Sequence, residues 1–163
     1  MLPSIRLTSL ILAAGCLGLI ATGLYMQHML GLQPCALCIT QRIFIIAVGL
    51  TAFGAFIHHP QNIGRRLYAG IGVLLAMVGG YFSSHHMWLQ GLPADEAPAC
   101  GPGLDYIFDT FPLQEALTVL LRGDGNCAEI VWSLLGLSIA GWTLIAFIGL
   151  ALINLWQLLR KQS

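Results

Sequence analysis

The stretch Pro34-Cys35-Ala36-Leu37-Cys38-Ile39-Thr40-Gln41-Arg42 begins in a short hinge, residues 29–36, and enters a long apolar run. Two thiols at the spacing of Cys35 and Cys38 can close a small disulfide, and such a pair is more often redox-active than structural. A helix beginning near Pro34, a residue that suits a first helical turn, would favour a thiolate through its N-terminal dipole. Cys38 and Arg42 would then share one helix face, so the guanidinium can stand beside a sulfur or a molecule bound next to it.

Zinc binding is the alternative interpretation of this cysteine pair, because CxxC is also half of a zinc knuckle. A knuckle needs a second pair of ligands at short spacing, and none follows in the sequence. We therefore predict a redox-active pair and no metal site.

The composition predicts an integral membrane protein. Of the 163 residues, 57% are hydrophobic and only 9% are charged, and the mean hydropathy is +0.80. A soluble domain carries about 25% charged residues, so this chain cannot cover itself with a hydrated surface. The net charge is zero and no basic run is present, which argues against nucleic acid as a partner.

Four apolar runs predict an all-α bundle of four transmembrane helices, a single domain over 1–163, with spans near 7–27, 39–57, 67–82 and 134–155. The first run resembles a signal peptide with a lipoprotein box ending at Cys16. It continues well past the length of a signal peptide, so we expect an uncleaved anchor with an inert Cys16 in mid-bilayer. Small residues spaced by four, which let helices approach closely, occur in the third and fourth runs: Gly72, Ala76 and Gly80, then Gly136 and Ala140.

Charge predicts the orientation of the spans. Five basic residues fall on the side of the two termini and the turn at 58–66: Arg6, Arg65, Arg66, Arg160 and Lys161. All seven acidic residues fall in one long loop: Asp95, Glu96, Asp105, Asp109, Glu115, Asp124 and Glu129. The positive-inside rule then puts both termini in the cytoplasm and the loops at 28–38 and 83–133 outside.

The long loop holds two more cysteines, Cys100 and Cys127, among many turn-forming residues. Between them, one apolar face of a short amphipathic helix is predicted, made of Leu113, Ala116, Leu117, Leu120 and Leu121. This helix is expected to lie flat on the membrane surface, the alternative being that it packs on the loop itself. A Cys100–Cys127 disulfide would staple the loop and stay open to attack by an outside thiol.

Two cysteine pairs on one face suggest a relay of two electrons by thiol–disulfide exchange. Because the chain has no flavin or dinucleotide fingerprint, the final oxidant is expected to be a small molecule dissolved in lipid, and a quinone is the obvious candidate. Arg42 is the polar residue expected beside it, since an arginine within a span is costly and usually functional. The alternative for Arg42 is that it snorkels to the interface from near a helix end.

Two groups of residues resemble the disulfide bond formation protein B (DsbB) family of bacterial inner-membrane quinone reductases. The first is Gln27-His28 with the Cys35–Cys38 motif and Arg42, and the second is Gly125-Asn126-Cys127-Ala128-Glu129 with Trp132 and Leu135-Gly136-Leu137. The resemblance covers nearly the whole chain and includes its four spans, a short first outer loop and a long second one. The cysteine pattern combined with this topology is its specific part.

This resemblance implies a route for the electrons. A reduced periplasmic DsbA-type oxidant would attack Cys100 of a Cys100–Cys127 disulfide, Cys127 would attack Cys35, and Cys38 would be released as a thiolate facing ubiquinone or menaquinone. Arg42 would stabilise that thiolate, and a histidine at the mouth of the third span would lie near the quinone. His86 of the tandem His85-His86 is the better match, its alternative being a solvated interface histidine. Gln41 stands where some relatives carry an acid, which puts an acid–base role there in doubt.

Three other functions compete with this interpretation. A vitamin K epoxide reductase-like thiol oxidase would have its loop cysteines before the CxxC motif, whereas here the motif comes first. A haem-binding cytochrome b subunit is suggested by five histidines, but all five are expected at helix ends or turns. An inert scaffold with two structural disulfides would tolerate Cys35→Ser without loss of disulfide formation.

Overall fold

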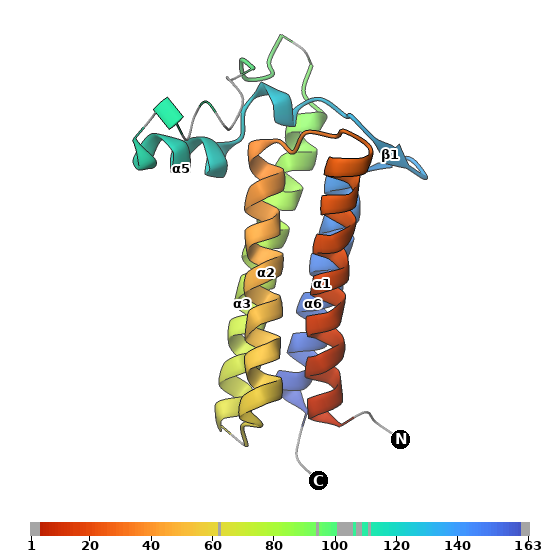
Figure 1. Ribbon diagram of the computed structural model, residues 1–163, viewed down its shortest axis with the longest axis vertical. Helices are drawn as coiled ribbons and strands as arrows, with labels where there is room; N and C mark the ends of the chain where they lie inside the picture. The colour runs from red at the N-terminus through yellow and green to blue at the C-terminus, as the bar shows by residue number, and fades with distance from the viewer. Residues whose placement is uncertain are drawn as a thin grey trace.

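The fold is a bundle of four long helices (Figure 1), and the computed structural model describes residues 4–61, 63–93, 95–100, 106, 109–110 and 112–160. The long helices are α1 (Ile5–Met29), α2 (Ala36–His58), α3 (Ile63–Gln90) and α6 (Ile139–Leu159). Each is long and apolar enough to cross a membrane. The two termini and the α2–α3 turn lie at one end of the bundle, and α5 (Leu113–Arg122) projects to one side at the other end. The predicted four-helix membrane architecture is therefore confirmed.

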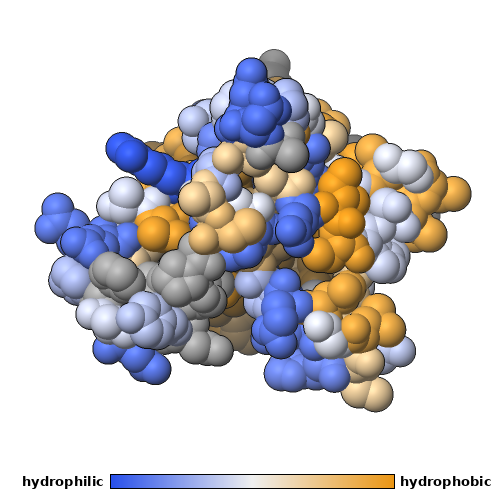
Figure 2. Space-filling view, turned by 90° about the horizontal axis from the view of Figure 1, so that it is seen from above, coloured by the Kyte–Doolittle hydropathy of each residue, from blue (hydrophilic) through white to orange (hydrophobic). Residues whose placement is uncertain are grey.

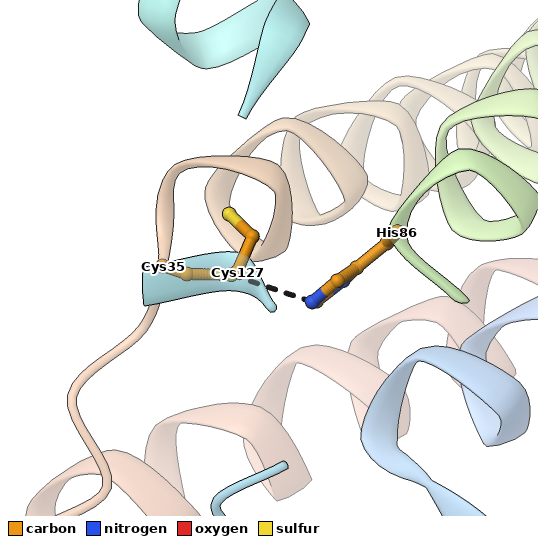
Figure 3. A group of neighbouring side chains, drawn as sticks. All are labelled: Cys35, His86 and Cys127. Atoms are coloured by element: carbon orange, nitrogen blue, oxygen red, sulfur yellow. Dashed lines mark hydrogen bonds between the residues drawn. The ribbon is translucent and has the colours of Figure 1, made fainter. Parts of the chain in front are cut away.

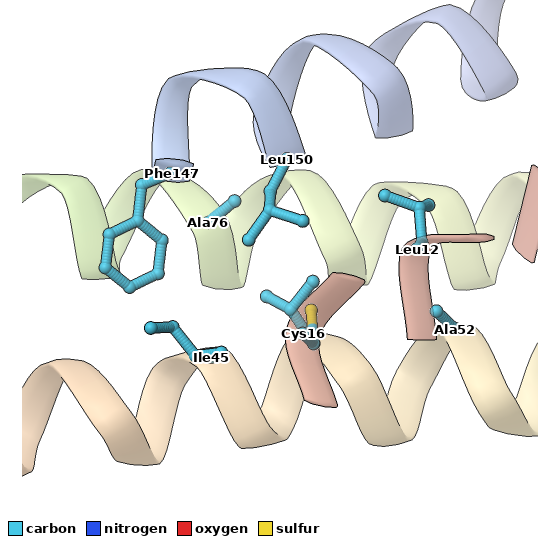
Figure 4. Packing of buried hydrophobic residues seen from close by; sticks show 8 residues of the cluster. Leu12, Cys16, Ile45, Ala52, Ala76, Phe147 and Leu150 are labelled. Atoms are coloured by element: carbon cyan, nitrogen blue, oxygen red, sulfur yellow. The ribbon is translucent and has the colours of Figure 1, made fainter. Parts of the chain in front are cut away.

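The helices pack in the order α1, α2, α3, α6, and α1 makes few contacts with α6. All four contribute to one apolar core, in which Leu12 and Cys16 of α1 meet Val48 of α2 and Phe147 of α6 (Figure 4). The Cys16 side chain is only 2% exposed. It lies in mid-helix among apolar neighbours, as predicted.

Small residues of α3 let α6 approach closely. Gly72 and Ala76 are buried, as expected from their spacing. A Cβ at Gly72 would overlap the Asn154 side chain of α6. Gly79, which the spacing by four does not include, makes an equally close approach, because a Cβ there would overlap the Phe147 ring. At Gly80 a Cβ would lie 3.6 Å from the Phe147 Cβ, an ordinary contact. The packing stripe thus continues through Gly79 as well as Gly80.

Two predicted span boundaries differ by five residues or more from the helices observed, and the others differ by one to four. The third helix continues to Gln90, eight residues past the predicted end, because its polar residues Ser83 and His86 are buried inside the bundle instead of facing water. The fourth helix begins at Ile139 and not at 134. Residues 133–138 form a hairpin of β1 (Ser133–Leu134) and β2 (Leu137–Ser138), with the turn residues Leu135 and Gly136 at φ 55° and 80°. Gly136 therefore serves a turn that needs positive φ and is not part of a helical stripe.

The amphipathic helix is confirmed as α5, and its apolar face is divided in two. Ala116 and Leu120 are buried, and Leu120 belongs to a cluster with Leu37 of α2 and Leu89 of α3. A second row on the same helix remains exposed: Leu113, Leu117 and Leu121. The carbonyl oxygens at the end of α5 accept hydrogen bonds from the bundle, Leu120 from the Thr40 hydroxyl (2.6 Å) and Arg122 from His85 Nε2 (3.0 Å).

Figure 2 looks onto the end of the bundle that carries α5. Hydrophilic side chains cover much of this face, and hydrophobic ones gather toward one edge. This end also holds the first residues of α2 and the last residues of α3, and the candidate site lies between them.

Candidate active site

Cys35 is the N-cap of α2, and the helix proper begins at Ala36, two residues after Pro34. The Cys35 sulfur accepts a hydrogen bond from the Cys38 amide at 3.4 Å, and the two sulfurs are 3.0 Å apart. This is the predicted helix N-terminus, where unpaired amides favour negative charge. All five cysteines carry free thiols, so the geometry is that of the reduced protein.

Cys127 comes to the same place from the long loop. It ends the short helix η1 (Gly125–Cys127), and its side chain is fully buried. The reactive atoms of Cys35, Cys127 and His86 all lie within 4.8 Å of one another (Figure 3), and His86 Nε2 is 3.7 Å from the Cys35 sulfur. Three segments far apart in the chain thus converge on one point.

Hydrogen bonding between the thiols of Cys35 and Cys127 shifts their pKa values in opposite directions. Hydrogen bonding with Cys127 raises the pKa of the Cys35 thiol, and the same hydrogen bond lowers the pKa of Cys127. The backbone amide of Leu37, in the first turn of α2, also donates to the Cys127 sulfur and lowers its pKa further. In the reduced protein Cys127 is therefore the better placed thiolate of the two.

His86 is held by amide side chains on both ring nitrogens. Its Nδ1 lies 3.2 Å from the Gln41 amide and its Nε2 lies 3.5 Å from the Gln90 amide. The Gln90 amide is held in turn by the Ser138 hydroxyl, which donates to its oxygen at 2.6 Å. With 2% of its surface exposed, His86 is a buried residue and not a solvated interface histidine. His85, by contrast, faces the end of α5.

Arg42 turns toward α1 and does not snorkel out of the bundle. Its Nη1 donates to Gln27 Oε1 at 2.6 Å and its Nη2 donates to the Gly23 carbonyl at 2.9 Å. The side chain is half-buried one turn below Cys38. A fixed cation is therefore positioned beside the cysteine pair at the depth of the first helical turns.

A cavity of about 430 Å³ connects these groups. Its polar lining includes both cysteines of the hinge, Arg42, His86 and four glutamines: Gln27, Gln33, Gln41 and Gln90. The rest of its wall is mainly apolar and comes largely from α1 and α6, for example Leu19 and Trp142. Since α1 and α6 make few contacts, the cavity lies on the loosely packed side of the bundle.

Cys100 is exposed and stands outside the cluster of Cys35, His86 and Cys127. The backbone just before it runs along η1, where the Gly125 amide donates to the Ala99 carbonyl at 3.1 Å. The predicted Cys100–Cys127 disulfide stays a prediction.

Sequence reasoning assigned no role to Gln90 or Ser138, although a polar residue next to an apolar run is a signal that could have found them.

Comparisons with known proteins agree with this geometry. The family model for the disulfide bond formation protein DsbB matches residues 5–157. The chain is 58% identical to disulfide bond formation protein B of Saccharophagus degradans over 160 residues, covering 98% of this chain and 96% of the relative. It is 48% identical to the protein of that name from Stutzerimonas stutzeri (88% of each chain) and 47% identical to that from Methylococcus capsulatus (96% and 95%). The chain therefore belongs to the DsbB family of multi-pass membrane proteins of disulfide bond formation.

Proposed function

We propose that this protein is a quinone-dependent thiol oxidase that reoxidises a periplasmic DsbA-type dithiol protein and so sustains disulfide formation in secreted proteins. The observation that carries the proposal is the cavity of about 430 Å³ that joins the Cys35–Cys38 pair to Arg42 and His86. The cysteines supply electrons at one edge of this cavity, and its apolar wall suits an oxidant drawn from lipid.

The residues around the cavity fit a quinone. Its volume lies within the roughly 300–1,000 Å³ of small-molecule sites, and a few polar groups are set in a largely apolar wall. The Arg42 guanidinium and the His86, Gln41 and Gln90 side chains can donate hydrogen bonds to ring oxygens. A quinone bound there supplies an acceptor for two electrons and two protons. The sparse contact between α1 and α6 suits entry from the bilayer.

The relay proceeds by thiol–disulfide exchange. The partner dithiol attacks Cys100 of the Cys100–Cys127 disulfide, and the second partner thiol resolves the mixed disulfide, leaving two thiols in the loop. Cys127 then attacks Cys35 of a Cys35–Cys38 disulfide and expels Cys38 as a thiolate. Cys100 displaces Cys35 from Cys127, which restores the loop disulfide and leaves Cys35 and Cys38 reduced. Support comes from the position of Cys127, whose sulfur lies within 4.8 Å of the Cys35 sulfur.

Charge supports an inner-membrane orientation with the site on the periplasmic side. Four of the six described arginines belong to the end of the bundle that carries the termini: Arg6, Arg65, Arg66 and Arg160. The positive-inside rule assigns that end to the cytoplasm. Cys35, Cys38 and Cys127 then face the compartment where secreted proteins acquire disulfides.

Anaerobic mixing of the purified protein with a reduced DsbA-type thioredoxin and a soluble quinone tests the proposal. Quinone absorbance is expected to fall as the partner becomes oxidised, and Cys38→Ala is expected to abolish the change. Failure of the wild-type protein to reduce quinone, or full activity of Cys38→Ala, would contradict the proposed function.

Arg42→His tests the assigned role of the cation. We expect a rise in the quinone concentration needed for half-maximal rate, because the guanidinium lines the cavity, while exchange with the partner protein remains near wild type. Arg66→His, an exposed cation near the start of α3, is the matched control and should change neither reaction. Equal loss of both reactions in Arg42→His would tell against the assignment.

A further inference from the structure

We propose that the reduced protein binds one zinc ion through Cys35, His86 and Cys127. Their ligand atoms lie within 4.8 Å of one another, which is close enough for one small ion to reach all three after minor side-chain adjustment. Two thiolates and one imidazole are a donor set that zinc prefers. The Cys38 sulfur, 3.0 Å from that of Cys35, is the nearest further donor for a fourth position.

This donor set is invisible to spacing rules. His86 is 51 residues from Cys35 along the chain, and Cys127 belongs to a separate loop. A zinc knuckle is recognised by two ligand pairs at short spacing, whereas here the fold assembles single ligands from the α2 cap, α3 and η1. The ligands also lie in a secluded place, since His86 is 2% exposed and Cys127 is fully buried.

The groups behind the ligands suit a metal as well. Zinc requires a free lone pair on His86 Nε2, which in a neutral ring leaves the proton on Nδ1. The Gln41 amide beside Nδ1 accepts that proton when its oxygen is turned to the ring, because both orientations of the amide fill the same space. Such outer hydrogen bonds fix the orientation of ligating histidines in known metal sites.

Zinc binding is linked to the redox state of the chain. Ligation needs thiolates, so each cysteine that binds the ion releases its proton, and a cysteine in a disulfide cannot bind. A bound ion would hold Cys127 beside Cys35 and keep both sulfurs from thiol–disulfide exchange. This consequence rests on the proposed function: zinc is then a reversible inhibitor that binds the reduced form.

Direct binding to the full-length protein in detergent tests the site. The protein is reduced anaerobically, freed of reductant and titrated with zinc against a chromophoric chelator. We expect one tightly bound zinc per reduced chain and none at this site after oxidation of Cys35 and Cys38. Absence of tight binding to the reduced chain would overturn the proposal.

Two matched pairs of variants identify the ligands. His86→Asn should lower the zinc affinity by more than the roughly 10–100-fold that loss of an outer partner costs, whereas His85→Asn, which faces α5, should leave it unchanged. Cys127→Ser should likewise lower the zinc affinity, whereas Cys100→Ser should keep it, because Cys100 is outside the cluster. If either pair fails to separate, the three-residue site is wrong.

Cobalt substitution adds a readout that folding alone cannot mimic. Cobalt bound in place of zinc is expected to show thiolate-to-metal absorption, which should weaken in Cys127→Ser and persist in Cys100→Ser. Metal binding is measured without turnover, so a failure to bind metal would not contradict the proposed quinone reduction. Conversely, a chain that binds zinc but never reduces quinone contradicts the proposed function and leaves the metal site intact.

Discussion

The Cys127 sulfur receives hydrogen bonds from the Cys35 thiol and from the Leu37 amide at the first turn of α2. Both contacts stabilise negative charge on sulfur, and the second uses an amide that has no partner within its own helix. The Cys35 thiol can make its contact only while Cys35 is reduced. When Cys35 is in a disulfide, the Leu37 amide remains, so the helix that Cys35 caps still stabilises the attacking thiolate.

Thiol titration tests this arrangement. In a variant that keeps only Cys35 and Cys127, made with Cys16→Ala, Cys38→Ala and Cys100→Ala, one thiol should ionise below the ordinary pKa of about 8.5 and the other above it. The thiolate of the first therefore persists to lower pH than that of a free cysteine. Ultraviolet thiolate absorbance against pH gives the two steps.

Adding Cys35→Ala to that variant is the control. The remaining thiol of Cys127 loses its main hydrogen-bond donor, so its pKa should rise toward the ordinary value. An unchanged titration of Cys127 would show that Cys35 does not stabilise its thiolate.

At the scale of elements, η1 packs against the loop segment before Cys100, and at Gly125 the contact is between backbone atoms. A Cβ at Gly125 would overlap the Pro98 carbonyl oxygen and lie 2.7 Å from the Cys100 amide nitrogen. Neither atom belongs to a flexible side chain that could move aside. The glycine therefore lets the backbone at Cys100 run against η1, the short helix that ends at Cys127.

Gly125→Ala is expected to push the two loop segments apart. The loop disulfide should then form more slowly, with the fraction of Cys100–Cys127 bond at a fixed redox potential falling at least several-fold. Mass spectrometry after alkylation of free thiols measures that fraction. Gly91→Ala, where a Cβ would make only ordinary contacts at 3.5 Å or more, should behave as wild type.

The contact of α3 with α6 at Gly79 leads to a second prediction about elements. Gly79→Ala must displace the buried Phe147 ring, so we expect a loss of about 1–3 kcal/mol, the usual cost of overpacking. Gly70→Ala, with open space around its Cβ, should not destabilise the bundle. Thermal unfolding in one detergent compares them, and equal stability of the two variants would contradict the close packing.

Sequence patterns predict those elements that hydropathy alone determines. Four long apolar runs and one short amphipathic repeat are readable because lipid and water sort side chains over many residues. The end of α3 was missed because buried polar residues such as Ser83 look like loop residues in a hydropathy pattern. The hairpin at 133–138 was missed because its leucines continue the apolar run, and the turn shows only in the positive φ of Leu135 and Gly136.

The site was predicted residue by residue, but not its arrangement. The four cysteines, Arg42 and His86 follow from motif and resemblance, and the structure brings Cys35, Cys127 and His86 together. Spacing cannot show that Arg42 is held by Gly23 and Gln27 of α1, because that contact depends on how two helices are rotated against each other. Tertiary contacts of this kind supply most of the polar network.

At the scale of the whole molecule, the cavity and the Cys35–Cys38 pair occupy one end of helices that are 21 to 28 residues long. On the proposed function, an electron pair leaving a periplasmic protein would reach its acceptor without passing the middle of the bilayer, and its protons would travel with it. Moving one charge across 100 mV costs about 2.3 kcal/mol, a term that would be absent here. Proteoliposomes given a potassium diffusion potential should therefore oxidise thiols equally fast at either sign of voltage, and the enzyme would run at the same rate in an energised cell and a depolarised one.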